Sequence, residues 1–137
     1  MKELRIVIFI TLLLVVFLSF TTIIQSDLKV IRYKKVSDGF LVIEYFDGVI
    51  KKQVKRNQLT KHELTFSEKN EIEKEISKLN VDLIISEIDT INKPILGVSY
   101  MYLFIKNKDT LRTRFYPEGA TPKQLQRVDY LMNKNRK

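Results

Sequence analysis

The sequence predicts an α+β domain preceded by an apolar N-terminal helix. Residues 6–24 contain no charged side chain, and the chain that follows alternates apolar with polar residues in strand-like stretches. Two further stretches begin with helix-start signals and carry apolar residues at helical spacing. We expect an antiparallel sheet of two hairpins plus a short strand, with two helices on one face. The predicted units are a membrane anchor or signal segment at 1–26 and a single small domain at 27–137.

The apolar segment is long enough to cross a bilayer as a helix. Its nineteen residues would rise about 28 Å at about 1.5 Å per residue, and the hydrocarbon core is about 30 Å thick. An uncleaved anchor is favoured over a cleaved signal peptide, because the apolar stretch exceeds the usual signal core of about 7–15 residues. The residues expected to span the membrane include Ile6, Phe9, Leu13, Val16, Phe20 and Ile24.

Basic residues on both sides of this segment bear on its orientation. Lys2 and Arg5 precede it and favour a cytoplasmic N-terminus. A juxtamembrane basic group follows it and favours the opposite orientation; this group is Lys29, Arg32, Lys34 and Lys35. We expect the N-terminus inside, because an early basic pair is usual in export signals. The predicted localisation is a single-pass membrane protein with an extracytoplasmic domain, and the alternative is a secreted or periplasmic domain after cleavage.

Three predicted strands open the domain. Leu28–Val36 alternates apolar with basic residues, which indicates a half-buried strand. Phe40–Phe46 is β-branched and aromatic, as is typical of a central strand. The Asp47–Gly48 pair predicts a type I′ hairpin turn. It leads into Val49–Lys55, whose lysines are typical of an edge strand.

A polar connector, Asn57–Leu64, leads to the first predicted helix of the domain. Thr65 and Glu68 form a capping box, in which a hydroxyl and a carboxylate satisfy the first free amide groups. The apolar face of this helix recurs at helical spacing. Its members are Ile72, Ile76 and Leu79.

The second half is predicted to contain a short strand, a hairpin and a final helix. Val81–Ile88 is the short strand, and Val98–Ile105 is a strand with an aromatic face. Thr110–Tyr116 is expected to pair back as the second arm of a hairpin. The last helix, Thr121–Lys134, starts with a capping threonine followed by Pro122 at the first helical position.

This order of elements resembles small exported or membrane-anchored bacterial α+β domains of unknown function. The resemblance is one of pattern and covers most of residues 28–134. It implies an α+β fold and carries no established active site. Its elements are a hairpin (Phe40–Lys55), a capped helix (Thr65–Leu79), a second hairpin (Val98–Tyr116) and a C-terminal helix (Thr121–Lys134).

The chain is basic, with 24 Lys and Arg against 16 Asp and Glu and a net charge of +8. Because residues 1–26 hold Lys2, Arg5 and Glu3, a net charge of +7 falls on the domain. Such an excess favours anionic lipid or acidic polymers as partners, whereas a merely solvated basic surface is the alternative. Nucleic acid is not expected, since the sequence has no RNA-binding signature.

The sequence shows no catalytic, cofactor or metal motif. It lacks cysteine, which excludes disulfides, thiolate zinc sites and a cysteine nucleophile. Its one histidine, His62, lies in the polar connector and is expected on an exposed loop. Glu71, Glu73 and Glu75 are interleaved with lysines and are expected on a solvated helix face. We therefore expect no enzymatic activity and no cofactor.

One candidate binding face remains on the second hairpin. It consists of Tyr100, Tyr102, Arg112, Arg114 and Tyr116. Exposed tyrosines beside arginines can stack bases or sugars, whereas a face that packs under the helices would bind nothing. The expected function is a membrane-tethered or exported interaction module that docks on another cell-envelope protein. The alternative is a basic domain that binds anionic lipid or acidic polymer at the membrane surface.

Overall fold

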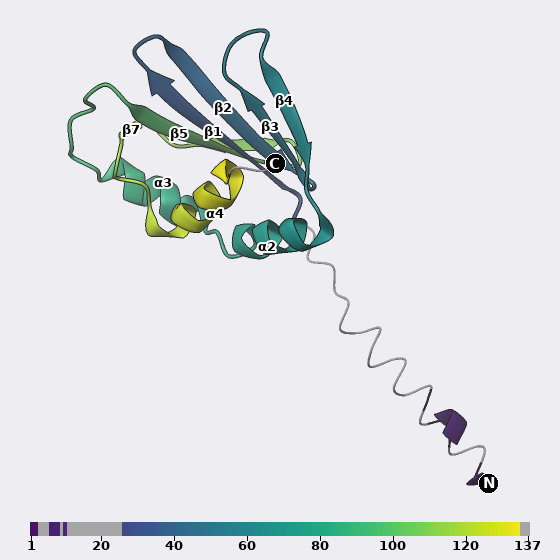
Figure 1. The fold of residues 1–137 in the computed structure, drawn as a ribbon. Helices are drawn as coiled ribbons and strands as arrows, with labels where there is room; N and C mark the ends of the chain where they lie inside the picture. Colours follow the sequence, from purple (N-terminus) through teal and green to yellow (C-terminus); the bar gives the residue numbers. More distant parts are fainter. Residues whose placement is uncertain (3–5, 9, 11–25, 135–137) are drawn as a thin grey trace.

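The computed structural model describes residues 1–2, 6–8, 10 and 26–134 (Figure 1). The strands are β1 (Leu28–Val36), β2 (Gly39–Phe46), β3 (Val49–Gln53), β4 (Leu59–Glu63), β5 (Ser99–Lys106), β6 (Asp109–Arg112) and β7 (Tyr116–Pro117). The helices of residues 26–134 are α2 (Phe66–Ile76), α3 (Val81–Asp89) and α4 (Lys123–Asn133). They lie together on one side of the sheet (Figure 1). The α+β class and the antiparallel sheet are therefore confirmed.

The sheet has the strand order β4-β3-β2-β1-β5-β6, and β7 pairs with β5. In the central strand β1, Val30 lies opposite both Tyr45 of β2 and Phe104 of β5. These three side chains are buried, because residues directly opposite one another on paired strands share a face and this face meets the helices. The buried core continues into the helices through Ile72, Ile76, Ile84, Ile88, Leu125, Val128, Leu131 and Met132.

The turn between β2 and β3 has the predicted type I′ geometry. Asp47 and Gly48 both have positive φ, at 45° and 78°, as this turn requires. A Cβ added at Gly48 would lie 3.0 Å from Cδ of Lys69. Both the left-handed backbone conformation and the limited space therefore favour glycine at this position. The Leu64 N–H donates to the Gly48 carbonyl at 2.8 Å and joins the start of α2 to this turn.

Helix α2 begins with the predicted capping box. The Glu68 N–H donates to Thr65 Oγ1 at 3.3 Å, and the Thr65 N–H donates to Glu68 Oε2 at 3.0 Å. Two of the first orphan amide groups are thus satisfied. The helix buries Ile72 and Ile76 as expected, and also Glu73, which was not expected.

The predicted strand at Val81–Ile88 is wrong, because this segment forms helix α3. Its N-terminus is capped by Asn80, whose Oδ1 accepts from the Leu83 N–H at 3.1 Å. Ile84 and Ile88 are buried four residues apart, which is helical spacing. The β-branched composition favoured a strand, and tertiary burial outweighed that weak preference. Three helices, not two, therefore cover the sheet in the described part of the chain.

The predicted polar connector contains an additional strand, β4. Ile50 of β3 lies opposite His62, and Lys52 lies opposite Thr60. The edge of the sheet is thus β4 and not β3 as predicted. Its polar sequence is what an exposed edge strand needs to avoid pairing with other chains.

The predicted strand Thr110–Tyr116 is interrupted at Thr113, which separates β6 from β7. The Thr113 N–H donates to the Tyr102 carbonyl at 3.0 Å, and the Thr113 Oγ1 accepts from the Tyr102 N–H at 3.0 Å. The Thr113 hydroxyl oxygen thus accepts the Tyr102 N–H in place of the backbone carbonyl that regular strand pairing would supply. This substitution ends the regular pairing of β6 with β5.

Helix α4 begins without the predicted threonine cap. Pro122 is itself the N-cap and forms no side-chain cap hydrogen bond. The Thr121 carbonyl instead accepts from Gln126 Nε2 at 3.2 Å. Burial of four apolar residues holds the helix in place without a capping side chain; they are Leu125, Val128, Leu131 and Met132.

The N-terminal segment is described only in part. Ile6 has a helical backbone and an exposed side chain. The other residues expected to span the membrane lie outside the described residues; they are Phe9, Leu13, Val16, Phe20 and Ile24. Among the residues that the structure describes, no helix is both long and apolar enough to span a bilayer. The anchor therefore stays a prediction of the sequence.

Candidate interaction surface on the open sheet face

The three tyrosines of the candidate binding face belong to the core. Tyr100, Tyr102 and Tyr116 are buried on the sheet face that the helices cover. Tyr102 donates its hydroxyl hydrogen bond to Asp129 of α4, and burial together with this carboxylate raises the pKa of Tyr102 well above its usual value. The hydroxyl therefore stays protonated and serves as a donor. These tyrosines therefore match the alternative considered from the sequence, in which this face of the strand packs under the helices.

The two arginines of that candidate face lie apart from the tyrosines. Arg112 is exposed and lies opposite Leu103, whose side chain points to the uncovered sheet face. Arg114 donates to the Ile91 carbonyl and forms an ion pair with Asp89 at 3.8 Å. The five residues therefore do not form one surface, because alternate residues of a strand face opposite sides.

The juxtamembrane basic group is divided between the two faces in the same way. Arg32 points under the helices, is 8% exposed and forms an ion pair with Asp129 at 2.8 Å. Lys34 shares that face and lies 5.9 Å from the centre of the Tyr100 ring. Lys29 and Lys35 belong to the opposite face, because they alternate with Arg32 along the strand. These four residues therefore do not form a single basic cluster.

The sheet face opposite the helices is uncovered in the described part of the chain, and we call it the open face. Its central apolar residues are only partly buried, although they lie in the middle of the sheet. Apolar surface of this kind often marks an interaction site. The apolar residues of the open face are Ile31, Tyr33, Val42, Val49, Met101, Leu103 and Ile105.

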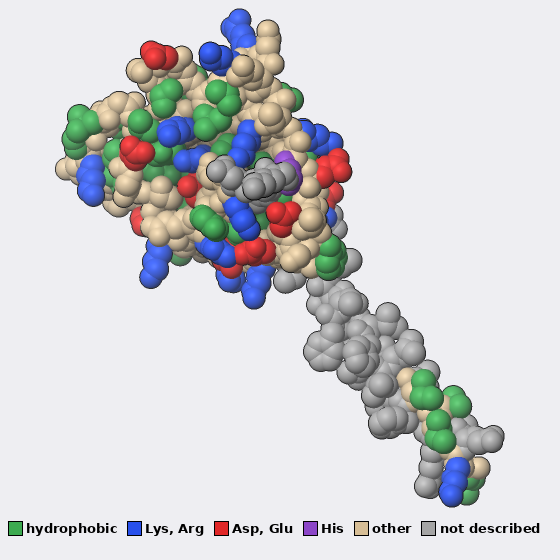
Figure 2. All heavy atoms as spheres, in the orientation of Figure 1, with side chains coloured by type: hydrophobic (Ala, Val, Ile, Leu, Met, Phe, Trp, Pro, Cys, Tyr) green, Lys and Arg blue, Asp and Glu red, His purple; other side chains and the backbone are tan. Residues whose placement is uncertain are grey.

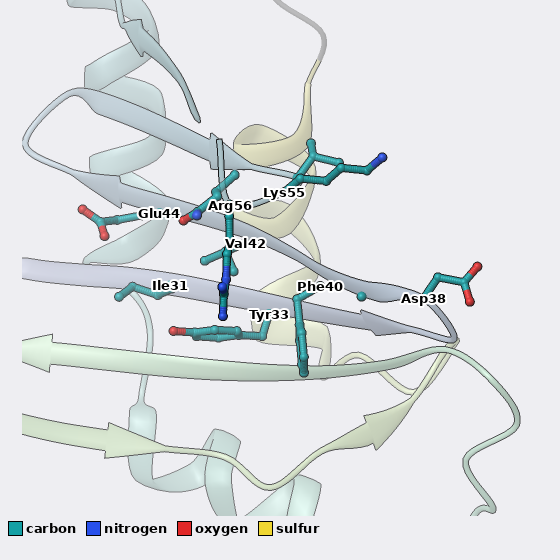
Figure 3. Close-up of a pocket in the computed structure, with 11 residues that line it drawn as sticks. Ile31, Tyr33, Asp38, Phe40, Val42, Glu44, Lys55 and Arg56 are labelled. Atoms are coloured by element: carbon teal, nitrogen blue, oxygen red, sulfur yellow. The ribbon is translucent and has the colours of Figure 1, made fainter. Parts of the chain in front are cut away.

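A groove of about 720 Å³ lies on the open face (Figure 3). Its floor includes Tyr33 and Val42, and Phe40 stands beside them with half of its side-chain surface exposed. The other wall is the loop between β3 and β4. Two backbone hydrogen bonds close this loop, from Val54 to Gln58 at 3.2 Å and from Gln58 to Lys55 at 3.0 Å.

The wall of the groove is basic. Arg56 extends over Val42 toward the ring of Tyr33, whereas Lys55 points outward (Figure 3). Neither residue forms an ion pair with any residue that the structure describes. Glu44 lines the same groove, but Lys29 and Lys51 already hold its carboxylate at 3.5 and 3.7 Å. The groove thus combines an apolar floor with unpaired positive charge.

On the side of the domain shown in Figure 2, Lys and Arg are distributed over both the sheet and the helices. Acidic neighbours pair with several of them, as in the contacts of Arg127 with Glu71 and of Lys78 with Glu75 at 3.0 Å. On this side of the domain, the net positive charge therefore singles out no patch.

The residues weighed for chemistry do not converge on one site in the described part of the chain. His62 is on strand β4 rather than on a loop, and with Lys52 and Lys134 it lines a pocket of about 280 Å³ that no carboxylate lines among the described residues. Glu73 is completely buried, so the expectation of a solvated face was wrong for this residue. Within residues 26–134, no group of three or more His, Asp or Glu side chains could hold a metal ion.

Sequence reasoning missed the groove residues Phe40, Lys55 and Arg56. A signal for Phe40 was available, because Phe40, Val42 and Phe46 alternate on the outer side of β2 while Ile43 and Tyr45 fill the core. A strand with apolar residues on both sides predicts two apolar faces. Comparison with protein-family models and with curated protein sequences finds no match for this chain.

Proposed function

We propose that this chain is a membrane-tethered interaction module of the cell envelope, or an exported one if the N-terminal segment is cleaved. It docks on a partner protein and performs no chemistry of its own. The observation that supports this proposal is the open face, where apolar residues in the middle of a sheet remain partly exposed. Covering apolar surface contributes about 25 cal/mol per Å², so a partner that covers this face gains affinity from it.

The chemistry of the groove favours one kind of partner segment. Tyr33, Phe40 and Val42 offer an apolar surface, and Lys55 and Arg56 bring positive charge to its edge. An extended segment with an apolar side chain next to Asp or Glu complements both features. We therefore expect the partner to contribute an acidic, apolar-containing strand or loop.

The position of the groove suits a tethered domain. Strand β1 starts next to Ser26, and its nine residues rise about 30 Å at about 3.3 Å per residue. The turn after β1 and the loop after β3, which form part of the groove, therefore lie at the end of the sheet opposite Ser26. A domain anchored before Ser26 would present this groove away from the membrane.

Photo-crosslinking in cells that produce the full chain tests this proposal. A benzophenone amino acid in place of Phe40 is expected to give a discrete protein adduct, because this ring stands at the edge of the groove. The matched position is Tyr130, an exposed aromatic residue on α4 on the other side of the domain. We expect no corresponding adduct from Tyr130.

A charge reversal adds a second readout to the same experiment. Arg56→Glu is expected to reduce the Phe40 adduct several-fold, because it places a negative charge against an acidic partner. Lys123→Glu, on the exposed surface of α4, is the control and is expected to leave the adduct unchanged. Equal adducts from Phe40 and Tyr130, or a Phe40 adduct that is insensitive to Arg56→Glu, would contradict docking at the groove.

A further inference from the structure

The end of the domain where the chain enters at Ser26 has its own surface, which we call the tether end. The Ser26 N–H donates to Glu73 Oε2 of α2 at 2.6 Å, so the incoming chain is fixed against the helix layer. Leu28 lies opposite Lys106, which brings the turn between β5 and β6 to the same place. The tether end consists of Asp27, Lys29, Phe46, Phe66, Lys106, Asn107 and Lys108.

Independent contacts bring the remaining segments to this end. A hollow of about 360 Å³ is lined jointly by Asp27, Lys29, Phe46 and Asn107, together with Ile105. Phe66 is close to the turn after β2, because the Leu64 N–H donates to the Gly48 carbonyl at 2.8 Å. Lys69 also binds this turn, with its Nζ 2.7 Å from Asp47 Oδ1. Residues that are about 80 positions apart in the sequence thus meet where the chain enters.

The tether end exposes two large aromatic side chains. Phe66 is 70% exposed and Phe46 is 43% exposed. Lys29 lies over the Phe46 ring at 5.3 Å from its centre. Lys106 and Lys108, at the turn between β5 and β6, are exposed and form no ion pair with any described residue. Of the carboxylates at this end, Asp47 is held by Lys69 and Glu63 by Lys61, whereas Asp27 and Asp109 are exposed. The aromatic rings are therefore the main feature, and the lysines accompany them.

We propose that the tether end rests on a phospholipid bilayer, with Phe46 and Phe66 in the headgroup region and Lys106 and Lys108 on lipid phosphates. This inference rests on the proposed membrane tethering, because it takes the uncharged residues 6–24 to hold the chain in the same bilayer. Exposed aromatic side chains beside lysines are the pattern of interfacial membrane contacts. The contact would fix the orientation of the domain and direct the groove away from the membrane.

The membrane-facing residues differ from those that proximity in the sequence suggested. Of the juxtamembrane basic group, only Lys29 is at the tether end. Lys35 lies about 20 Å farther along β1, at about 3.3 Å per residue, which exceeds the Debye length of about 8 Å at physiological ionic strength. Lys106 and Lys108 take their place, because the antiparallel pairing of β1 with β5 returns the chain to Leu28.

The test uses the full chain reconstituted in vesicles of phosphatidylcholine with phosphatidylglycerol and no other protein. Because the chain has no cysteine, Asn107→Cys gives a single site for a spin label at the tether end. A lipid-linked nickel chelate should relax this label strongly, whereas it should not relax a label at Asp38→Cys in the turn after β1. A relaxation at Asn107 no greater than at Asp38 would overturn the inference.

Substitutions at the tether end are expected to weaken the contact by predictable factors. Phe66→Ser should lower the ratio of docked to undocked domain about tenfold, and Lys108→Gln should lower it about fivefold. The matched control is Lys123→Gln on the exposed surface of α4, which should leave the ratio unchanged. Relaxation that is unaffected by both tether-end variants would contradict the roles assigned to these residues.

The same samples separate this inference from the tethering on which it rests. If the chain does not float with the vesicles, membrane tethering fails and the inference fails with it. If the chain floats but the Asn107 label is not relaxed, tethering holds and only the docked orientation is wrong. Docking of a partner at the groove does not enter either result, because no partner is present.

Discussion

Replacing Asp129 with alanine is expected to lower the free energy of unfolding by about 3 kcal/mol. Asp129 of α4 accepts from the Tyr102 hydroxyl and lies 2.8 Å from Nε of Arg32, whose side chain is only 10% exposed. Its removal leaves the Arg32 charge nearly buried with Asn133 as its remaining hydrogen-bond partner, at 2.9 Å. We expect the lower end of the usual range of about 3–5 kcal/mol, because a quarter of the Asp129 side chain is exposed.

Chemical denaturation of the full chain in detergent, followed by near-ultraviolet circular dichroism of the buried tyrosines, measures this loss. Lys123→Ala on the exposed side of the same helix is the control and should change stability by less than about 0.5 kcal/mol. Joint replacement of Arg32 by Met, Tyr102 by Phe and Asp129 by Leu should restore most of the loss, because none of these three positions then holds a buried unpaired polar group. A loss below about 1 kcal/mol for Asp129→Ala would show that the ion pair behaves as a surface pair.

Glu73→Ala is the second substitution with a large expected effect, a loss of about 2–4 kcal/mol. The Glu73 carboxylate is completely buried and accepts from the Tyr45 hydroxyl and from the Ser26 N–H. Both donors lose their acceptor in the variant. The Tyr45 hydroxyl itself accepts from the Gly48 N–H at 3.1 Å, so the loss extends to the turn after β2. Burial and the neighbouring Glu73 raise the pKa of Tyr45 above its usual value, which keeps this hydroxyl a donor.

Two measurements distinguish this network from ordinary helix stability. Glu71→Ala is the matched control on the same helix, and it should cost no more than about 1 kcal/mol, because Glu71 pairs with Arg127 at the surface. Amide hydrogen exchange at Ser26 should become faster in Glu73→Ala and stay unchanged in Glu71→Ala. Protection of Ser26 that persists without Glu73 would show that other contacts fix the incoming chain.

The strands and turns that could be predicted have strong local signals. Leu28–Val36 alternates in strand fashion along its whole length and forms β1 with the predicted bounds. The Asp47–Gly48 turn and the capping box at Thr65 and Glu68 depend on the side chains and glycine of a few adjacent residues. Such local sequence preferences predict the folded structure correctly because the tertiary contacts agree with them.

The elements that were mispredicted depend on distant partners. Leu59–Glu63 is too polar to indicate a strand, and it becomes one because β3 offers a free edge. Val81–Asp89 has a strand-like composition, and it becomes a helix because Ile84 and Ile88 are buried at helical spacing. Thr113 interrupts its strand through a hydrogen bond to Tyr102, eleven residues away in the sequence.

The tyrosines of the candidate binding face lie on the sheet face that the helices cover. Alternation places Tyr100 and Tyr102 on one side of β5, and the sequence alone does not say which side the helices cover. Both sides of the central strands are apolar, so either could have been the core. The ion pair of Arg32 with Asp129 joins residues 97 positions apart, and no local sequence pattern predicts it.

Cysteine modification most directly tests the central claim that a partner covers the open face. Leu103→Cys introduces the single thiol of the chain at the centre of the open face, and Leu83→Cys introduces it on exposed α3. A maleimide reagent should modify the Leu103 variant several-fold more slowly in native membranes than in purified protein, and the Leu83 variant equally in both. Equal rates for Leu103→Cys in the two preparations would contradict the claim.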